Sequence, residues 1–169
     1  TGKHVFGVDA KDGALLWQYD YAALDPPDFK MAAGINPVTP LYHDGQIYVT
    51  SGYDHVGAML HLADDGRSVS LAWKDKTLDC HHGGVVRVGD RIYGSNWLDN
   101  KRGNWCSIDW NSGKALYEEE WISKGSVVYA DGMLYCYAEK RGYFGLVRPS
   151  DEGFELVSSF QITAGDGQH

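Results

Sequence analysis

Apolar and polar residues alternate along most of the chain in short segments, which are separated by turns rich in glycine and aspartate. Three of these segments share one pattern: an Asp-Gly or Gly-Asp pair, one further residue, an aliphatic residue and a tyrosine. Such a pair between two alternating segments is typical of a tight hairpin turn. The pattern therefore predicts a β-hairpin around each of residues 44–48, 89–93 and 131–135.

A second pattern lies between copies of the first. It consists of a short apolar segment, a polar turn that contains glycine, and a segment that contains an aromatic residue. Residues 8–17 and 108–117 are clear copies, and residues 62–73 and 147–157 are looser ones. The glycines at positions 13, 66, 113 and 153 are 53, 47 and 40 residues apart, and aliphatic positions 47, 92 and 134 of the first pattern are 45 and 42 apart. The chain therefore contains an internal repeat.

A repeat of roughly 40–50 residues with about four short strands per unit is typical of a β-propeller blade. One such sheet cannot bury both of its faces alone, whereas sheets stacked around an axis bury them against each other. We therefore predict an all-β chain of four-stranded antiparallel blades, about half of a ring of six to eight blades. The predicted parts are a half-blade (1–21), a linker (22–36), three blades (37–78, 85–122 and 125–162) and an exit segment (163–169).

Composition agrees with an all-β chain, since the 169 residues include 21 glycines and 22 aromatic residues. Only residues 114–121 resemble an amphipathic helix, and the repeat predicts a strand there instead. The formal net charge is −8, and no run of basic residues occurs, which argues against nucleic acid as a partner. No apolar stretch reaches the roughly 20 residues that a membrane-spanning helix needs. Because the chain begins at Thr1, we expect it to be part of a longer protein.

The segment from Asp9 to Trp17, with Gly13 between them, resembles the repeat of pyrroloquinoline-quinone-type (PQQ-like) propellers. Residues 107–117 match the same pattern with Tyr117 in place of tryptophan, and residues 81–94 and 125–132 resemble a secreted bacterial subgroup. The resemblance implies a quinoprotein alcohol dehydrogenase-like fold and an extracytoplasmic location, periplasmic or secreted. The repeat residues are expected to shape turns and to fill the space between blades rather than to catalyse a reaction: Asp9, Gly13, Trp17, Gly66, Trp73, Asp109, Gly113 and Tyr117.

The catalytic quinoproteins of this family hold their cofactor against a disulfide between two adjacent cysteines. Here Cys80, Cys106 and Cys136 are far apart in the sequence, and no Cys-x-x-Cys pair exists. We expect buried thiols, with one disulfide left open as an alternative. The sequence therefore predicts no catalytic residue, no metal ligand and no bound cofactor within this chain, and PQQ and calcium are implied by the resemblance alone.

Two polar segments are candidates for ligand binding. The first contains His81 and His82. In a strand their side chains would point to opposite sides and would not share a metal ion, whereas a turn before the strand would relax this restriction. His55 or His61 would have to complete such a site. The second is the loop of residues 96–105, in which Asn96, Trp97 and Asp99 are candidate ligand contacts. A purely structural role is the alternative for each of these residues.

Three functions remain open at this stage. We favour a binding or scaffold module of an exported bacterial protein, with a protein or carbohydrate ligand. Its further partner is expected to be the remainder of its own propeller, or a second copy that closes the ring. The alternative is part of a PQQ-dependent alcohol dehydrogenase, of the polyvinyl alcohol type, whose cofactor residues lie mostly elsewhere. A hydrolase or lyase that uses His81 and His82 is the third.

Overall fold

A computed structural model describes residues 3–25 and 35–163, so residues 1–2, most of the predicted linker and the predicted exit segment beyond residue 163 lie outside the described residues. The described chain forms fourteen strands and one short 3₁₀ helix, η1 (Ala22–Leu24). The prediction of an all-β fold made of four-stranded antiparallel sheets is confirmed, and residues 115–119 form a strand rather than a helix. No helix of the described chain has the length and apolar character needed to cross a membrane.

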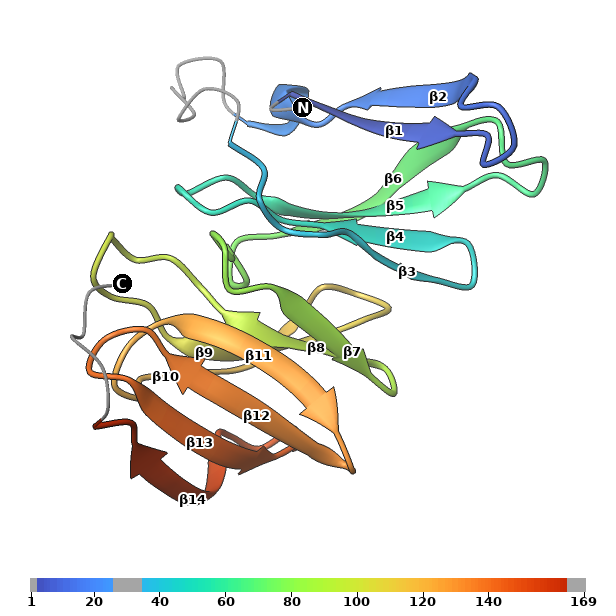
Figure 1. The fold of residues 1–169 in the computed structure, drawn as a ribbon. Helices are drawn as coiled ribbons and strands as arrows, with labels where there is room; N and C mark the ends of the chain where they lie inside the picture. The colour runs from blue at the N-terminus through green and yellow to red at the C-terminus, as the bar shows by residue number, and fades with distance from the viewer. Residues whose placement is uncertain (1–2, 26–34, 164–169) are drawn as a thin grey trace.

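The strands form four separate antiparallel sheets that follow one another in sequence order, as Figure 1 shows. The first sheet has two strands, β1 (His4–Val8) and β2 (Leu15–Asp20). The second contains β3 (Leu41–His43), β4 (Gln46–Val49), β5 (Gly57–Leu62) and β6 (Val69–Asp75). The third contains β7 (Val85–Val88), β8 (Arg91–Ser95), β9 (Trp105–Asp109) and β10 (Ala115–Glu119). The fourth contains β11 (Gly125–Ala130), β12 (Met133–Ala138), β13 (Tyr143–Arg148) and β14 (Glu155–Gln161).

The apolar core is divided into three clusters that follow the three junctions between successive sheets. Within β4, Ile47 and Val49 belong to a cluster with residues of the first sheet, whereas Tyr48 belongs to a cluster with residues of the third. In the same way, Ile92 of β8 belongs to the second cluster and its neighbour Tyr93 to the third. Because successive side chains of a strand point to opposite faces, the two middle sheets bury both faces. This is the packing expected of propeller blades.

The last hairpin of every sheet carries an irregularity at the same place. The register shifts between Gly7 and Val8, between Met59 and Leu60, at Leu116, and between Leu146 and Val147. The residue that pairs just before the shift is Trp17, Trp73 or Tyr117 in the first three sheets and Ser158 in the fourth. The aromatic repeat positions are therefore equivalent, although Trp17 and Trp73 are only partly buried, and Tyr117 alone is buried.

Trp73 shows what the aromatic position does between two sheets. A Cβ atom added to Gly113 of the third sheet would lie 2.4 Å from Cε3 of Trp73, so the indole lies directly on this glycine. Gly113 also has a positive φ of 69°, which a turn after Asp109 requires. Gly113 therefore serves both the turn and the contact with the neighbouring blade.

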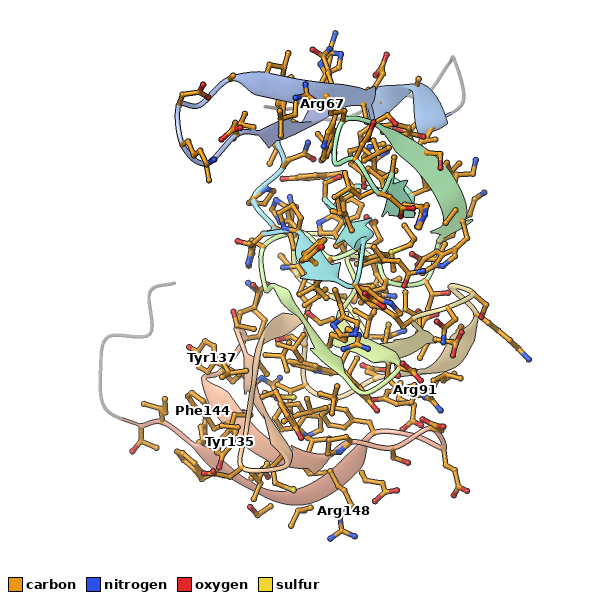
Figure 2. All side chains as sticks on the ribbon, turned by 90° about the vertical axis from the view of Figure 1, so that its right-hand side faces the viewer. Arg67, Arg91, Tyr135, Tyr137, Phe144 and Arg148 are labelled. Carbon is orange, nitrogen blue, oxygen red and sulfur yellow. The ribbon has the colours of Figure 1, made fainter. Side chains whose placement is uncertain are left out.

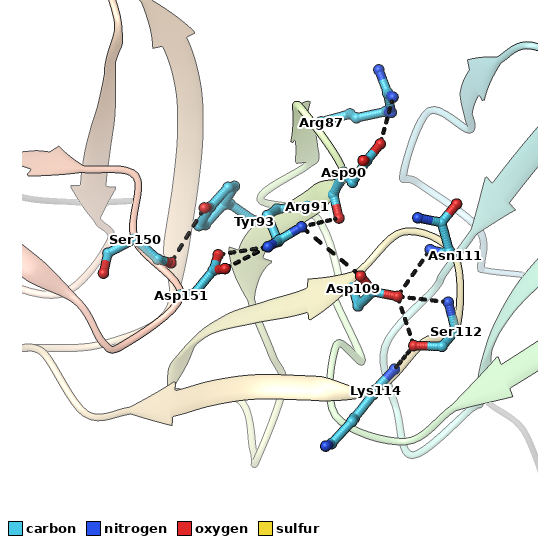
Figure 3. Close-up of polar contacts among 10 residues, drawn as sticks. All are labelled: Arg87, Asp90, Arg91, Tyr93, Asp109, Asn111, Ser112, Lys114, Ser150 and Asp151. Atoms are coloured by element: carbon cyan, nitrogen blue, oxygen red, sulfur yellow. Dashed lines mark hydrogen bonds and ion pairs between the residues drawn. The ribbon is translucent and has the colours of Figure 1, made fainter.

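The repeat aspartates shape their own turns. Asp109 accepts hydrogen bonds through Oδ1 from the backbone N–H groups of Asn111 (3.1 Å) and Ser112 (2.8 Å), as Figure 3 shows. Asp9 accepts one from the N–H group of Lys11 in the equivalent turn of the first sheet (2.8 Å). Aspartate side chains stabilise turns in this way, which agrees with a structural role for both residues.

Arg91 joins the third and fourth sheets on the side of these turns (Figure 3). Its guanidinium donates to both carboxylate oxygens of Asp151, which lies between β13 and β14, and its Nη1 atom is 3.9 Å from Oδ2 of Asp109. Tyr93 adds a hydrogen bond from its hydroxyl to the carbonyl oxygen of Ser150 (3.3 Å). These contacts form a polar clamp between the two blades.

We expect Arg91→Gln in the full-length protein to lower the melting temperature by about 1–3 °C at low salt, since an exposed ion pair contributes little and salt screens it. Thermal melts in 50 mM and 500 mM NaCl measure this effect, and it should shrink at the higher concentration. Arg102→Gln is the matched control, because Arg102 pairs with Asp99 inside a single loop. A salt-independent loss for Arg91→Gln would contradict the ionic clamp.

Candidate functional site

The longer loops of the second, third and fourth sheets meet on one side of the molecule (Figure 1, left). We call this side the loop face and define it by residues 50–56, 76–84, 96–104, 120–124 and 139–142. The opposite side carries the tight hairpin turns. In an antiparallel sheet, successive connections alternate between the two ends of the strands, so the links between sheets share a side with the loops between second and third strands. The five sequence-predicted contacts all lie on the loop face.

Two glycines, Gly52 and Gly83, allow these loops to approach neighbouring backbones closely. A Cβ atom on Gly52 would lie 2.6 Å from Cα of His81, and one on Gly83 would lie 1.8 Å from the carbonyl oxygen of Gly125. The N–H group of Val127 donates to the carbonyl oxygen of Gly83 (3.3 Å) at the same junction. Only glycine fits such backbone contacts. The loop before β7 is therefore held against the loop between β4 and β5 and against the start of β11.

His81 and His82 lie in the loop before β7, not in a strand, so the expectation that they point to opposite sides does not apply. Their ring centroids are 4.7 Å apart. The ring of His81 also contacts Tyr53 (4.4 Å), and Tyr53 contacts Trp97 (5.0 Å). We call Trp97, Tyr53, His81 and His82 the aromatic row. It runs across loops of the second and third sheets, and each ring other than that of His82 is partly buried.

Tyr53 was not predicted from the sequence. It follows Gly52, and both Tyr53 (φ 62°) and Asp54 (φ 63°) adopt the left-handed conformation that non-glycine residues rarely take. Strained residues of this kind occur frequently at functional sites. The signal in the sequence, a single glycine before tyrosine and aspartate, is too common to have identified the residue.

Asp79 lies beneath the aromatic row. Its Oδ2 atom accepts a hydrogen bond from the N–H group of Asp54 (2.7 Å), and its carbonyl oxygen accepts one from the N–H group of Trp97 (2.7 Å). Among the described residues, no hydrogen-bond donor contacts the buried Oδ1 atom. Burial raises the pKa of Asp79 to about 7. The carboxyl group of Asp79 therefore fixes the loop that presents Tyr53, and its backbone carbonyl group fixes the loop that presents Trp97.

The side chains of Asn96 and Asp99 are both engaged in contacts within the protein. The side-chain amide of Asn96, which is buried, donates to Oε1 of Glu118 (2.8 Å) and to the carbonyl oxygen of Thr77 (3.1 Å), and its Oδ1 accepts from the N–H group of Asn104 (2.7 Å). Asp99 accepts from Nε of Arg102 (2.7 Å), which holds the pKa of Asp99 below its usual range. In this structure both residues shape the loop that carries Trp97.

His82, Glu139 and Lys124 form an ionic group next to the aromatic row. Nε2 of His82 is 3.3 Å from Oε2 of Glu139, and the ammonium group of Lys124 pairs with Oε1 of the same carboxylate. Lys124 is buried, with 4% of its surface exposed. A buried ammonium group requires such compensation. Lys124 and Glu139 were not predicted from the sequence, because the two residues come from separate loops and their spacing follows no motif.

His55 and His61, the two histidines considered as further ligands, do not complete a site with His81 and His82. His55 is buried, pairs with Asp25 and packs against the ring of Tyr21 at 4.1 Å. His61 is exposed in β5. No group of three or more His, Cys, Asp or Glu side chains among residues 3–25 and 35–163 is placed to hold a metal ion.

The three cysteines are buried and free, and none forms a disulfide. Sγ of Cys80 contacts the carbonyl oxygen of Gly84 (3.3 Å), and Cys106 and Cys136 belong to different core clusters. Burial raises the pKa of Cys80 and of Cys136 to about 12. The thiols are therefore core side chains in this structure.

The described residues do not fit a quinone held with calcium. The three cysteines are free, and three of the nearby carboxylates are already engaged: Asp79 with the backbone, Glu118 with two asparagine amides, and Glu139 with Lys124 and His82. A hard cation such as calcium needs a set of oxygen ligands directed at one point. These contacts do not supply one in this part of the chain.

Known structures share this fold. No family model matches the chain, and no curated protein sequence resembles it. BamB from Moraxella catarrhalis is similar over 95% of the chain and 43% of its own length, at 16% identity and a TM-score of 0.63. A europium-containing methanol dehydrogenase is similar over 75% of the chain and 25% of its own length, at 16% identity and a TM-score of 0.58. The quinohemoprotein alcohol dehydrogenase from Comamonas testosteroni is similar over 73% of the chain and 20% of its own length, at 17% identity and a TM-score of 0.54.

These likenesses define the class of fold. The chain has the β-propeller fold, as the repeat predicted, and it spans less than half the length of each of these three proteins. At such identities the likeness concerns the fold, and function has to be argued from the site itself.

Proposed function

We propose that the chain is part of a propeller that acts as a binding or scaffold module, with the loop face as its binding surface. The observation that carries this proposal is the aromatic row, which lies across two blades next to the ionic group of His82, Glu139 and Lys124. Aromatic side chains with a few fixed polar groups are typical of ligand-binding surfaces. The structural contacts of the Asp79, Glu118 and Glu139 carboxylates favour binding over quinone chemistry.

The proposed ligand is a protein segment or a carbohydrate, because tyrosine and tryptophan offer flat, partly apolar faces with polar edges to either. The proposed location is outside the cytoplasm, in an exported bacterial protein. Support for the location comes from the resemblance of residues 81–94 and 125–132 to a secreted bacterial subgroup of PQQ-like propellers.

A comparison of full-length wild type with Trp97→Ala on glycan and peptide arrays tests this function. We expect Trp97→Ala to lose the ligands that the wild type binds, and Tyr42→Ala to keep them. Tyr42 is the control position, a tyrosine in β3 that is 65% exposed. Circular dichroism establishes that both variants fold. Ligands that bind Trp97→Ala as well as the wild type would show that the loop face is not the binding surface.

The second candidate is part of a PQQ-dependent alcohol dehydrogenase, which is favoured by the two dehydrogenases with the same fold. It requires that the remainder of the protein supply the cofactor residues. Full-length protein incubated with PQQ and calcium should then show quinone absorbance and dye-linked alcohol oxidation. The binding-module proposal expects neither.

A further inference from the structure

A pocket of about 500 Å³ opens on the loop face, where the loop before β7 meets the fourth sheet. His81 and His82 lie on one side of it, and Lys124, Tyr137 and Lys140 line it from the fourth sheet and its loops. The pocket adjoins the His82 end of the aromatic row. Its volume is suited to a small organic molecule or to one residue of a larger ligand.

The charges around this pocket are mainly positive, although the whole chain carries a formal charge of −8. Lys124 and Lys140 contribute two positive charges, and Glu139 contributes the one carboxylate among the lining residues. That carboxylate is already shared between Lys124 and His82 through its two oxygens. The pocket therefore has an excess positive charge before either histidine is protonated.

Several hydrogen-bond donors line the pocket. The buried ammonium group of Lys124 has three N–H bonds, and in the described chain it contacts Glu139 and, at 3.4 Å, the carbonyl oxygen of Asn100. Lys140 is exposed at the rim, and the hydroxyl group of Ser126 lines the same space. A group that accepts several hydrogen bonds and carries negative charge matches these donors.

We propose that this pocket binds an oxyanion, the carboxylate or phosphate group of a small ligand, with Lys124 and Lys140 as the charged contacts. The ring of Tyr137, which packs against Phe144 at 5.1 Å, forms an apolar wall for the remainder of the ligand. Burial, and next the charge of His82 and Lys124, lowers the pKa of His81. An anion between these groups would offset their mutual repulsion. This inference rests on the proposed function, because it assigns a ligand chemistry to the same face.

Isothermal titration calorimetry on the full-length protein at pH 6.5 tests the proposal, with malonate and inorganic phosphate as probes. Malonamide is the uncharged match for malonate. We expect malonate or phosphate to bind and malonamide not to bind. The anion that binds with the higher affinity indicates whether the natural group is a carboxylate or a phosphate. Lys140→Gln should weaken the binding of that anion at least tenfold, because it removes a charge without disturbing the core.

Lys114→Gln is the matched control, since Lys114 lies in the turn between β9 and β10 on the opposite side of the molecule. The double variant Lys124→Gln/Glu139→Gln removes the buried pair together, so that neither charge is left alone. Loss of binding in this folded variant would support the assignment. Equal affinity of Lys140→Gln and Lys114→Gln, binding of malonamide, or no binding of either anion would overturn it.

Failure of this proposal can be distinguished from failure of the proposed function. If array ligands are lost in Trp97→Ala while malonate and phosphate do not bind, the loop face binds ligands without an oxyanion pocket. If Lys140-dependent anion binding occurs while array ligands are insensitive to Trp97→Ala, the pocket stands and the aromatic row is not the binding surface.

Discussion

Gly83→Ala is expected to destabilise the full-length protein by about 3 kcal/mol or more, because no rotamer can relieve a clash that involves two backbones. The new Cβ atom would lie 1.8 Å from the carbonyl oxygen of Gly125 and 2.7 Å from its carbonyl carbon. Relief requires separation of the loop before β7 from the start of β11, which breaks the hydrogen bond from Val127 to Gly83. Urea denaturation, read as a shift of the midpoint, measures the loss.

Gly132→Ala is the control for Gly83→Ala. Gly132 has a positive φ of 76° in the turn between β11 and β12, and nothing lies within 4 Å of the Cβ position. This variant therefore carries backbone strain alone, with a cost of about 1 kcal/mol. A loss of stability for Gly83→Ala no larger than that for Gly132→Ala would contradict the close contact between the backbones at Gly83 and Gly125.

Asp79→Asn is expected to stabilise the protein at pH 8 and to have little effect at pH 4. The native state raises the pKa of Asp79 to about 7, so it binds this proton more tightly than the unfolded chain does. The favourable contribution of the protonated group is complete below the ordinary value of 3.8 and is lost as the pH rises through about 7. Asparagine keeps an oxygen acceptor for the N–H group of Asp54 and carries no charge at any of these pH values.

The gain at pH 8 is on the order of 2–4 kcal/mol. Urea denaturation of the wild type and of Asp79→Asn at pH 4, 6 and 8 measures it, and the difference between them should grow with pH. Asp64→Asn, at an exposed position between β5 and β6, serves as the control. A difference that is constant with pH would show that the carboxyl group of Asp79 is not the buried group described here.

The fold was accessible from the sequence because it depends on local repeats. Each Asp-Gly turn fixes a hairpin by itself: Asp44 and Gly45, and Asp131 and Gly132, all adopt positive φ angles. The spacing of the turns then specifies one sheet per repeat, without knowledge of any distant contact. The shift in register beside Trp17, Trp73 and Tyr117 was not predicted, since it is a property of paired strands.

The site was less accessible, because it is made by loops that belong to different sheets. Lys124 and Glu139 meet His82 across 42 and 57 residues of sequence, and no pattern along the chain links them. Tyr53 reaches His81 only because Gly52 allows the close approach. Conversely, Asn96 was a candidate on the strength of its polar loop, and its partners Thr77, Asn104 and Glu118 became visible only in three dimensions.

The fourth sheet presents an unusual outer face. Its inner face packs on the third sheet through Leu134, Cys136 and Val147, whereas Tyr135, Tyr137 and Phe144 point away from that contact, as Figure 2 shows. Phe160 stacks on Phe144 at 5.7 Å and is 65% exposed. A contiguous aromatic surface of this kind is rare on a monomer. In a propeller, the next blade would cover the part of this surface around Phe144 and Phe160.

Light scattering on residues 1–169 expressed without the remainder of the protein, together with a thermal melt, tests the central claim that these blades belong to a closed ring. The account predicts aggregates, or a head-to-tail dimer in which two copies close a ring of about seven blades, because the face around Phe144 and Phe160 has to be covered. A monodisperse monomer with a cooperative melt would contradict it.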